Sequence, residues 1–302
     1  MKKIIAVAVA GAFAAPVMAA DVTLSGVMDF QYRDASGTTS ASYNGDTPAI
    51  TVAATSETAA GYTVSGSISL DPTVDDASFS VSGAFGKFAI GNPSGALDSV
   101  GDYTDIAPEL GGFNLDGQDN FLYFSPNLGI EGLGLHVSGN PAATGDGAGS
   151  SDEGTSVALS YTMGATQVYA GQERYKGDGA AADDSTADVT AYGVKTTIGG
   201  VMLAYERGTT KNSGASVTDG TLTGMAAKYS MGDVTLGVEN QSSDVAYMKL
   251  EQDAVGSTVA RFDRTTAFVS YNMGGGLSGY VEQSDEDVGG TNQTTIGLKY
   301  SF

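Results

Sequence analysis

Hydrophobic and polar residues alternate along almost the entire chain. Between Val22 and Tyr32 every second residue is apolar or glycine, whereas Thr23, Ser25 and Asp29 occupy intervening positions. A period of two predicts β-strands whose two faces differ. The same alternation returns in residues 62–70, 79–85, 157–163, 192–198, 225–231, 267–273 and 296–302. The pattern therefore predicts an all-β protein.

The alternation divides the chain into sixteen expected strands. We expect them to begin near residues 22, 50, 62, 77, 88, 120, 133, 155, 166, 188, 201, 221, 234, 264, 277 and 291. An even number of antiparallel strands closes on itself and leaves no unpaired edge in lipid. The facing of the short strands near residues 50, 88 and 120 stays open at this point.

The two faces of these strands differ in chemistry. Small hydrophilic side chains such as Ser65, Ser67 and Ser160 fill the polar face, and the apolar positions carry no charge. Tyrosine and phenylalanine stand at or near the ends of strands, at residues 32, 62, 85, 161, 229, 271 and 300. An apolar outside, a polar lumen and aromatic girdles are typical of a 16-stranded antiparallel transmembrane β-barrel. A soluble secreted sandwich also fits the alternation and is the weaker alternative.

The connections between strands are of two kinds. Tight glycine links alternate with long, acidic, glycine-rich loops. The segment Tyr161-Thr-Met-Gly164 ends a strand before a short turn, and Tyr229-Ser-Met-Gly232 and Tyr271-Asn-Met-Gly274 repeat it. Short turns at one end and long loops at the other indicate an outer-membrane barrel.

The first residues predict export. Lys2 and Lys3 precede an apolar run from Ile4 to Val17, and small residues follow it. This is the arrangement of a cleaved signal peptide, which we place at residues 1–19, with the barrel domain at residues 20–302. The expected location is the outer membrane of a Gram-negative bacterium.

Composition excludes several other functions. Loss of Lys2 and Lys3 with the leader takes the formal net charge from −21 to −23, which makes nucleic acid an implausible partner. The chain has no cysteine and one histidine, His136, so a thiol nucleophile is ruled out and a zinc site is not expected. We expect neither an enzyme nor a cofactor, although external aspartates could bind divalent cations, at residues 146, 152, 178, 183 and 184.

The connection from Asn92 to Asp119 is long and carries no basic residue. It holds Asp98, Asp102, Asp105 and Glu109. A long loop without secondary structure in a compact domain is often functional. Carboxylates in a narrow lumen raise the local concentration of cations, so this loop is the candidate site.

Within this loop, Tyr103-Thr-Asp-Ile-Ala-Pro-Glu-Leu-Gly-Gly112 resembles a segment of the general diffusion porins of Gram-negative outer membranes. In that family the third loop folds into the barrel. The resemblance implies that Asp105 and Glu109 form a pore constriction, with Asp98 and Asp102 nearby. It also implies a homotrimer, contact with outer-membrane lipid and lipopolysaccharide, and assembly by the barrel-insertion machinery, which recognises a terminal aromatic, here Phe302.

The enterobacterial members of this family place arginines on the wall opposite the loop, and this chain departs from them. Between Arg33 and Arg174 the sequence has one lysine, Lys87, and no arginine. The strand phase instead places other basic side chains in the lumen, namely Arg33, Lys195, Lys228, Arg264 and Lys299.

These observations favour a water-filled channel for passive diffusion of small hydrophilic solutes, with a preference for cations. A solute-specific channel is the alternative, and it would need a run of aromatic side chains along the lumen. A barrel enzyme would need a nucleophile and a base that converge. His136 alone, on the polar face of its strand, does not supply that arrangement.

Overall fold

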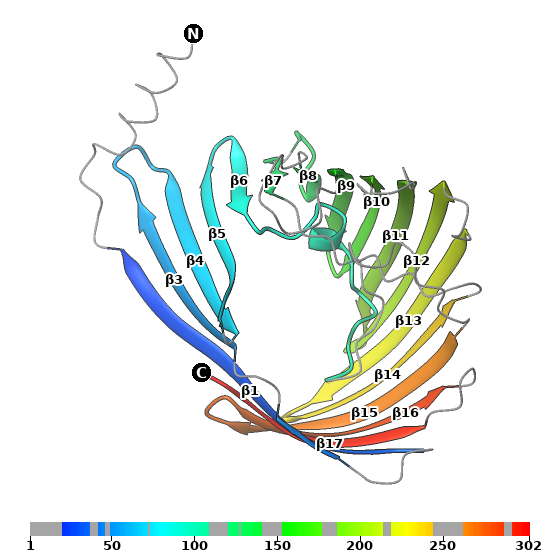
Figure 1. Cartoon of the computed structure of the whole chain (residues 1–302). Helices are drawn as coiled ribbons and strands as arrows, with labels where there is room; N and C mark the ends of the chain where they lie inside the picture. The colour runs from blue at the N-terminus through cyan, green and yellow to red at the C-terminus, as the bar shows by residue number, and fades with distance from the viewer. Residues whose placement is uncertain are drawn as a thin grey trace, which may run out of the picture.

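A computed structural model describes residues 20–36, 42–45, 49–71, 73–108, 120–126, 128–140, 153–176, 186–213, 219–243, 262–286 and 292–302. These residues form a closed ring of strands around an open centre (Figure 1). The elements are β1 (Asp21–Ala35), β2 (Ser42–Gly45), β3 (Ala49–Glu57), β4 (Thr63–Asp71), β5 (Thr73–Gly83), β6 (Gly86–Gly91), η1 (Asp98–Val100), β7 (Phe121–Phe124), β8 (Leu133–Asn140), β9 (Glu153–Met163), β10 (Thr166–Lys176), β11 (Thr186–Ile198), β12 (Val201–Ser213), β13 (Gly220–Met231), β14 (Val234–Ser243), β15 (Phe262–Gly274), β16 (Leu277–Glu286) and β17 (Gln293–Ser301).

Consecutive strands pair antiparallel, except that β2 and β3 both pair with β1, and β17 pairs with β1 to close the ring. The strands β2 and β3 pair with two successive parts of β1, so together they occupy one strand position of the barrel. The barrel therefore has sixteen strand positions, as the alternation predicted. The short strand β2 was not predicted, because its sequence, Ser-Tyr-Asn-Gly, has no alternation of apolar residues.

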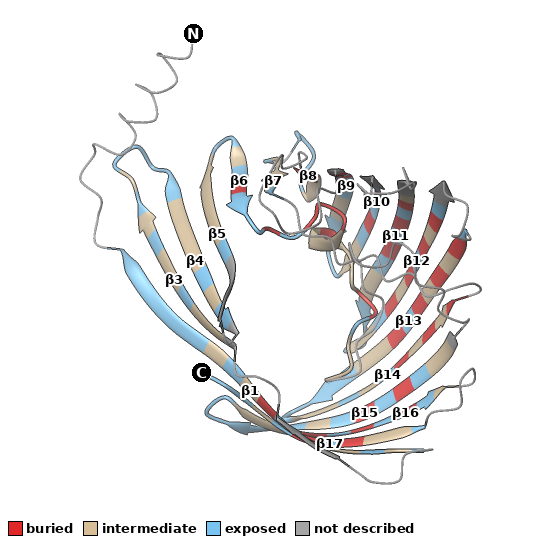
Figure 2. Cartoon of the chain, in the orientation of Figure 1, coloured by how far each residue is buried: buried red, intermediate tan, exposed pale blue. Residues whose placement is uncertain are grey.

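The outer face of the barrel is apolar and exposed. Leu24, Ile68 and Leu298 are 62%, 47% and 48% exposed, although side chains of this kind are normally buried in soluble proteins. Exposed and buried residues alternate along most strands from β9 to β17 (Figure 2). The predicted strand phase is confirmed, and the exposed apolar belt matches the lipid-facing surface of a transmembrane barrel.

The inner face is polar, and its small side chains bond across strands. Ser67 and Ser78 hydroxyls are 2.8 Å apart, and those of Thr51 and Ser69 are 3.0 Å apart. Strand register also shows which residues face the lumen in the short strands predicted near residues 88 and 120. Ile90 pairs with Phe79 and Phe121 on the outer face, while Lys87 pairs with Ser82 and Phe124 on the inner face.

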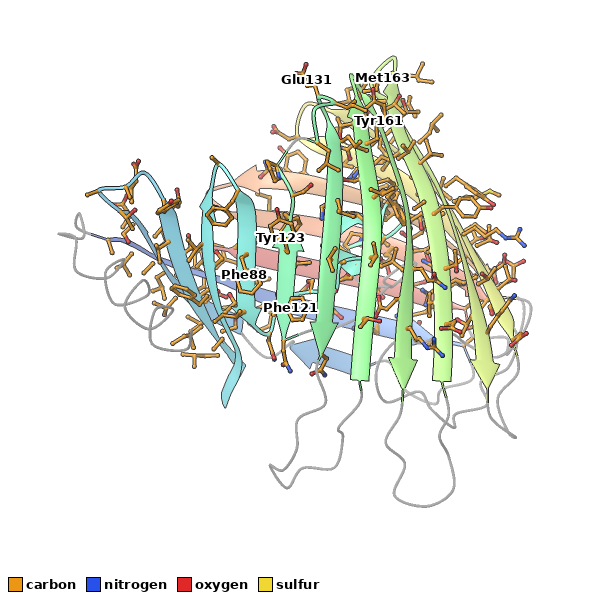
Figure 3. The ribbon with its side chains drawn as sticks, turned by 90° about the horizontal axis from the view of Figure 1, so that it is seen from above. Phe88, Phe121, Tyr123, Glu131, Tyr161 and Met163 are labelled. Atoms are coloured by element: carbon orange, nitrogen blue, oxygen red, sulfur yellow. The ribbon has the colours of Figure 1, made fainter. Side chains whose placement is uncertain are left out.

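The turns at one end of the barrel are tight. Between β11 and β12, Gly199 and Gly200 have φ of +59° and +84°, which glycine adopts without a steric penalty. Tyr161 lies near this end, beside Met163 and Glu131 (Figure 3). Among the described residues, no helix is long and apolar enough to cross a membrane.

Candidate functional site

The described part of the long connection after β6, residues 92–108, lies inside the ring of strands (Figure 1). We call it the seated loop, because its backbone is hydrogen-bonded to inward side chains of four strands: β8, β9, β12 and β14. The partners lie 42 to 133 residues away in sequence. The loop therefore runs across a wide sector of the inner wall.

The first attachment lies at the short helix η1. Ala96 N donates to Ser138 Oγ at 2.7 Å, and Leu97 N donates to Ser156 Oγ at 3.0 Å. Both serines are 1% exposed. A buried backbone N–H without a partner would be costly, so these two hydroxyls fix where the loop enters the lumen.

The second attachment is the buried carboxylate of Glu206 on β12. Its Oε2 accepts hydrogen bonds from Thr104 N and Thr104 Oγ1 at 2.7 and 2.8 Å, and its Oε1 accepts one from Tyr169 Oη at 2.7 Å. Charge-assisted hydrogen bonds of this length are among the stronger ones in proteins. Because Glu206 is 0% exposed, no water competes for these donors.

Glu239 on β14 makes the third attachment. Its Oε2 accepts hydrogen bonds from the backbone N–H groups of Ile106 and Ala107, both at 2.9 Å. Behind it, Gln241 Nε2 donates to Glu239 Oε1 at 3.4 Å, and Arg264 Nη2 donates to Gln241 Oε1 at 3.3 Å. Arg264 is thus linked to the loop through two wall residues.

An apolar seat lies beneath the loop. Leu97, Val100 and Tyr103 of the loop pack against wall residues Ala158, Tyr169, Val189, Ala191, Ala204, Leu222 and Ala226. Glycines on the inner wall leave room for this contact. A Cβ at Gly171 would stand 2.7 Å from Leu97 Cδ1, and a Cβ at Gly224 would clash with Thr104 Oγ1. The wall is therefore shaped to receive the loop.

Tyr103 joins the loop to a lysine of the wall. Its ring lies edge-on to Tyr169 with centroids 5.1 Å apart, and Lys195 Nζ lies 4.2 Å from its centroid. Burial, with the nearby Glu206 carboxylate, raises the pKa of Tyr103 to about 12. The phenol is therefore neutral at physiological pH, and Lys195 contacts the face of an uncharged aromatic ring.

The acidic residues predicted for the constriction lie along this loop. Asp105 is exposed between the attachments at Thr104 and Ile106, and Asp98 and Asp102 are half-buried. Asp102 has φ of +59°, a conformation that aspartate tolerates better than most residues. Glu109 lies outside the described residues.

The predicted lumen-lining basic residues all fall on inward positions of their strands. Lys299 pairs in register with Asp29, and Arg33 Nε donates to Gln31 Oε1 at 2.7 Å. Lys228 lies on β13 and is half-buried. Inward carboxylates are also present at comparable depth, and five are almost completely buried: Asp29, Glu173, Glu206, Glu239 and Glu282.

His136 is also on the inner face, beside η1. Its Nε2 lies 2.9 Å from Ser160 Oγ and its Nδ1 3.4 Å from Ser99 Oγ, and its ring meets Phe124 edge-on. These contacts hold the histidine between the wall and the loop.

Sequence reasoning missed the wall residues that hold the loop. A usable signal was present, because Glu206, Glu239 and Glu282 each occupy the sixth position of the strand that follows a short turn. A glutamate repeated at this position predicts a row of inward carboxylates at one height of the inner wall. The repeat does not predict that Glu206 binds Thr104 or that Glu239 binds Ile106.

The aspartates predicted to bind divalent cations, at residues 146, 152, 178, 183 and 184, lie outside the described residues. In the part of the chain that the structure describes, no three potential acidic, histidine or cysteine ligands come together. Phe302 is described, and it is hydrogen-bonded through its backbone to Gly26.

Comparison with known proteins identifies the family. The Gram-negative porin family matches residues 6–302. No curated protein matches the chain. The chain belongs to the Gram-negative porin family and forms an outer-membrane channel for passive diffusion.

Solved structures share the fold at low sequence identity. The chain resembles Salmonella typhi OmpF in a complex with daunomycin, with a TM-score of 0.74 and 16% identity over 93% of this chain and 97% of that one. A loop L8 deletion mutant of OmpT from Vibrio cholerae gives a TM-score of 0.72 and 16% identity, covering 94% and 100%. A porin refined at 1.8 Å gives 0.71 and 19%, covering 93% and 100%.

Proposed function

We propose that this porin prefers cations and that the seated loop, with Glu109 beyond it, forms the constriction that sets the preference. The observation that carries the proposal is the exposed Asp105, held over the inner wall between two backbone attachments. A carboxylate in a narrow, low-dielectric lumen attracts cations and repels anions.

The accessibility of charge in the lumen supports the same preference. The loop aspartate Asp105 is exposed and Asp98 and Asp102 are half-buried, whereas the inward carboxylates of the wall are almost completely buried. Of the inward basic residues, Lys195 is held on the Tyr103 ring, and Arg264 is hydrogen-bonded to Gln241. These contacts limit how far those two cations extend into the channel.

The solute-specific alternative has less support. A track for sugar stacking needs exposed aromatic rings along the lumen. Among the described residues, the inward rings of Tyr169, Phe268 and Tyr280 are 4%, 6% and 4% exposed. The inward ring of Phe124 is half-buried, with the His136 ring edge-on to it and Lys87 Nζ over its face.

The test is a reversal-potential measurement on the purified protein in a planar bilayer under a salt gradient. We expect a potential of the sign that marks cation selectivity. An anion-selective channel would contradict the proposal, and so would a channel without selectivity.

We also propose that the protein assembles as a homotrimer; in vitro folded OmpT of Vibrio cholerae, whose structure this chain resembles, is known in a trimer form. An apolar hollow of about 520 Å³ on the outer face of β3 to β6 offers a surface for a second copy, around Ala54, Gly66 and Ile68. Gel migration without heating, before and after cross-linking, would distinguish a trimer from a monomer.

The remaining assignments concern export and assembly. We propose that residues 1–19 are removed, so that N-terminal sequencing of the outer-membrane protein finds Ala20. We further propose contact with outer-membrane lipid and lipopolysaccharide, and insertion by the barrel-insertion machinery. Divalent cations on the external aspartates remain a proposal that calcium titration would test.

A further inference from the structure

Two tyrosines on the inner wall reach a carboxylate that lies two strands away. Tyr169 on β10 donates to Glu206 Oε1 on β12 at 2.7 Å. Tyr280 on β16 donates to the carboxylate of Asp29 on β1, whose two oxygens lie 3.1 and 3.2 Å from its hydroxyl. Each tyrosine and each carboxylate is at most 4% exposed. Because hydrogen bonds to a charged group are stronger than most, both contacts can hold strands together.

The strand between the two partners carries a glycine beneath each ring. Tyr169 pairs in register with Gly193, and Tyr280 pairs with Gly297. A Cβ at either glycine would clash with a ring atom of the paired tyrosine. Each tyrosine therefore passes over the middle strand, and its hydroxyl reaches the strand beyond. We call Tyr169, Gly193 and Glu206 the loop brace, and Tyr280, Gly297 and Asp29 the seam brace.

A third ring shows that a hydroxyl is not needed to place a ring over a glycine. Phe268 on β15 pairs with Gly237 on β14, and a Cβ at that glycine would clash with Phe268 Cε1. Phe268 is 6% exposed, much like the two tyrosines. A phenylalanine at position 169 or 280 should therefore keep the ring in place and remove only the hydrogen bond to the carboxylate.

The loop brace is connected to the seated loop. The second oxygen of the Glu206 carboxylate, Oε2, accepts the hydrogen bonds from Thr104 N and Thr104 Oγ1. The ring of Tyr103 lies edge-on to the ring of Tyr169. Because Tyr169 holds one carboxylate oxygen, rotation of the Glu206 side chain is restricted, and the other oxygen meets the loop in one orientation. Tyr169 thus acts on the loop through Glu206.

The seam brace lies where the barrel closes. The strands β16, β17 and β1 lie side by side, and β1 pairs with β17 at the closure (Figure 1). Asp29 is on β1 and Tyr280 is on β16, so separation of β1 from β17 breaks their hydrogen bond together with the backbone ladder. The loss of a charge-assisted hydrogen bond adds to the free energy needed to open the barrel at this joint.

We propose that Tyr169 and Tyr280 are positioning residues with separate tasks: the loop brace fixes the seated loop against the inner wall, and the seam brace keeps β1 joined to β17. The first part rests on the proposed role of the seated loop as the constriction, and the second part rests on the fold alone. One arrangement of three residues thus serves conduction at one place and closure of the barrel at another.

The test compares Tyr169→Phe with Tyr280→Phe, because the two changes remove the same chemical group. Both proteins are refolded in detergent, recorded as single channels, and unfolded in heated detergent while the loss of the folded gel band is timed. We expect Tyr169→Phe to change the conductance and to raise the open-channel current noise, because the loop moves more. Its unfolding rate should equal that of the wild type, since opening at the seam leaves β10 and β12 in place.

For Tyr280→Phe we expect the opposite result. The folded band should disappear about tenfold to a hundredfold faster, as the loss of a hydrogen bond to a charged group predicts. Conductance and current noise should equal those of the wild type. A Tyr280→Phe barrel that unfolds at the wild-type rate, or two variants that change both measurements alike, would overturn the proposal.

A double-mutant cycle shows whether the contact itself carries the effect at the seam. Asp29→Asn combined with Tyr280→Phe should accelerate unfolding by less than the product of the two single factors, because both changes weaken the same hydrogen bond. Factors that multiply would mean that the two side chains act independently, which contradicts the seam brace.

Hydrogen exchange provides a second measurement if Tyr280→Phe yields no folded barrel. In the Asp29→Asn variant, backbone amides of β1 and β17 should exchange faster than in the wild type, whereas those of β11 and β12 should exchange at the wild-type rate. Unchanged exchange in β1 and β17 would overturn the proposal. An anion-selective wild-type channel would instead contradict the proposed function, and it would leave the result at the seam unaffected.

Discussion

Asp105 is an acidic side chain of the seated loop that is exposed, while its neighbours Thr104 and Ile106 are tied to Glu206 and Glu239. We expect Asp105→Asn combined with Glu109→Gln to lower the cation-to-anion permeability ratio without loss of folding. Neutralising Asp183 and Asp184 should change the ratio less, and the gap should widen with salt, because exposed charges are screened over about 8 Å at physiological ionic strength. Reversal potentials of the two variants at several salt concentrations are the measurement. A double variant with the wild-type potential would show that these carboxylates do not set selectivity.

A second residue-scale prediction concerns the glycine seat. A Cβ at Gly224 would clash with Thr104 Oγ1, so Gly224→Ala should push the loop from the wall and change single-channel conductance. The control is Gly66→Ala on the outer face, where the nearest atom to a new Cβ is Ser78 O at 3.6 Å, an ordinary contact. We expect the control to conduct like the wild type. Equal conductance in both variants would contradict the seat.

The strands themselves allow a test of facing. Val194→Arg and Leu298→Arg place a charge among lipid-facing residues and should lower the free energy of unfolding by about 2 to 4 kcal/mol if they lie near the midplane. Ser160→Arg places the same charge on the inner face, next to His136, and should change conductance more than stability. Denaturant titration in lipid and single-channel recording separate the two effects. Similar behaviour of both classes would mean that the facing is wrong.

The strands were predictable because each one separates lipid from water. Alternate residues of a strand are therefore apolar toward the lipid and polar toward the lumen. Val157 and Leu159 on one side and Ser156 and Ser160 on the other fix β9 without knowledge of its neighbours. The loop attachments follow a different logic, because Glu206 and Thr104 are 102 residues apart and no local pattern links them. The sequence predicts that Lys195 lines the lumen, but its contact with the Tyr103 ring is visible only in the folded structure.

Closure of the whole barrel depends on its first and last strands, β1 and β17. Gly26 and Phe302 exchange backbone hydrogen bonds of 2.9 and 3.0 Å, and the Phe302 ring stacks with Tyr300 at 5.7 Å. We expect deletion of Phe302 to lower the yield of folded protein in the outer membrane, measured by heat-sensitive gel migration. Phe302→Tyr, which keeps an aromatic ring at this position, is the control and should give the wild-type yield. An unchanged yield without Phe302 would contradict a role for this residue in assembly.

The pairing of the first strand with the last also dictates an order of events. Val27 and Ser301 are neighbours in the finished sheet, yet almost the whole chain separates them, so the pairing of β1 with β17 is the least local strand pairing among the described residues. Contacts between distant segments form slowly, because the entropy of loop closure is lost before they are made. Until the last strand arrives, β1 presents a row of open backbone groups on which a strand of another chain could add. The unfinished barrel is therefore the aggregation-prone form, and its risk lasts until the final residues have crossed into the periplasm.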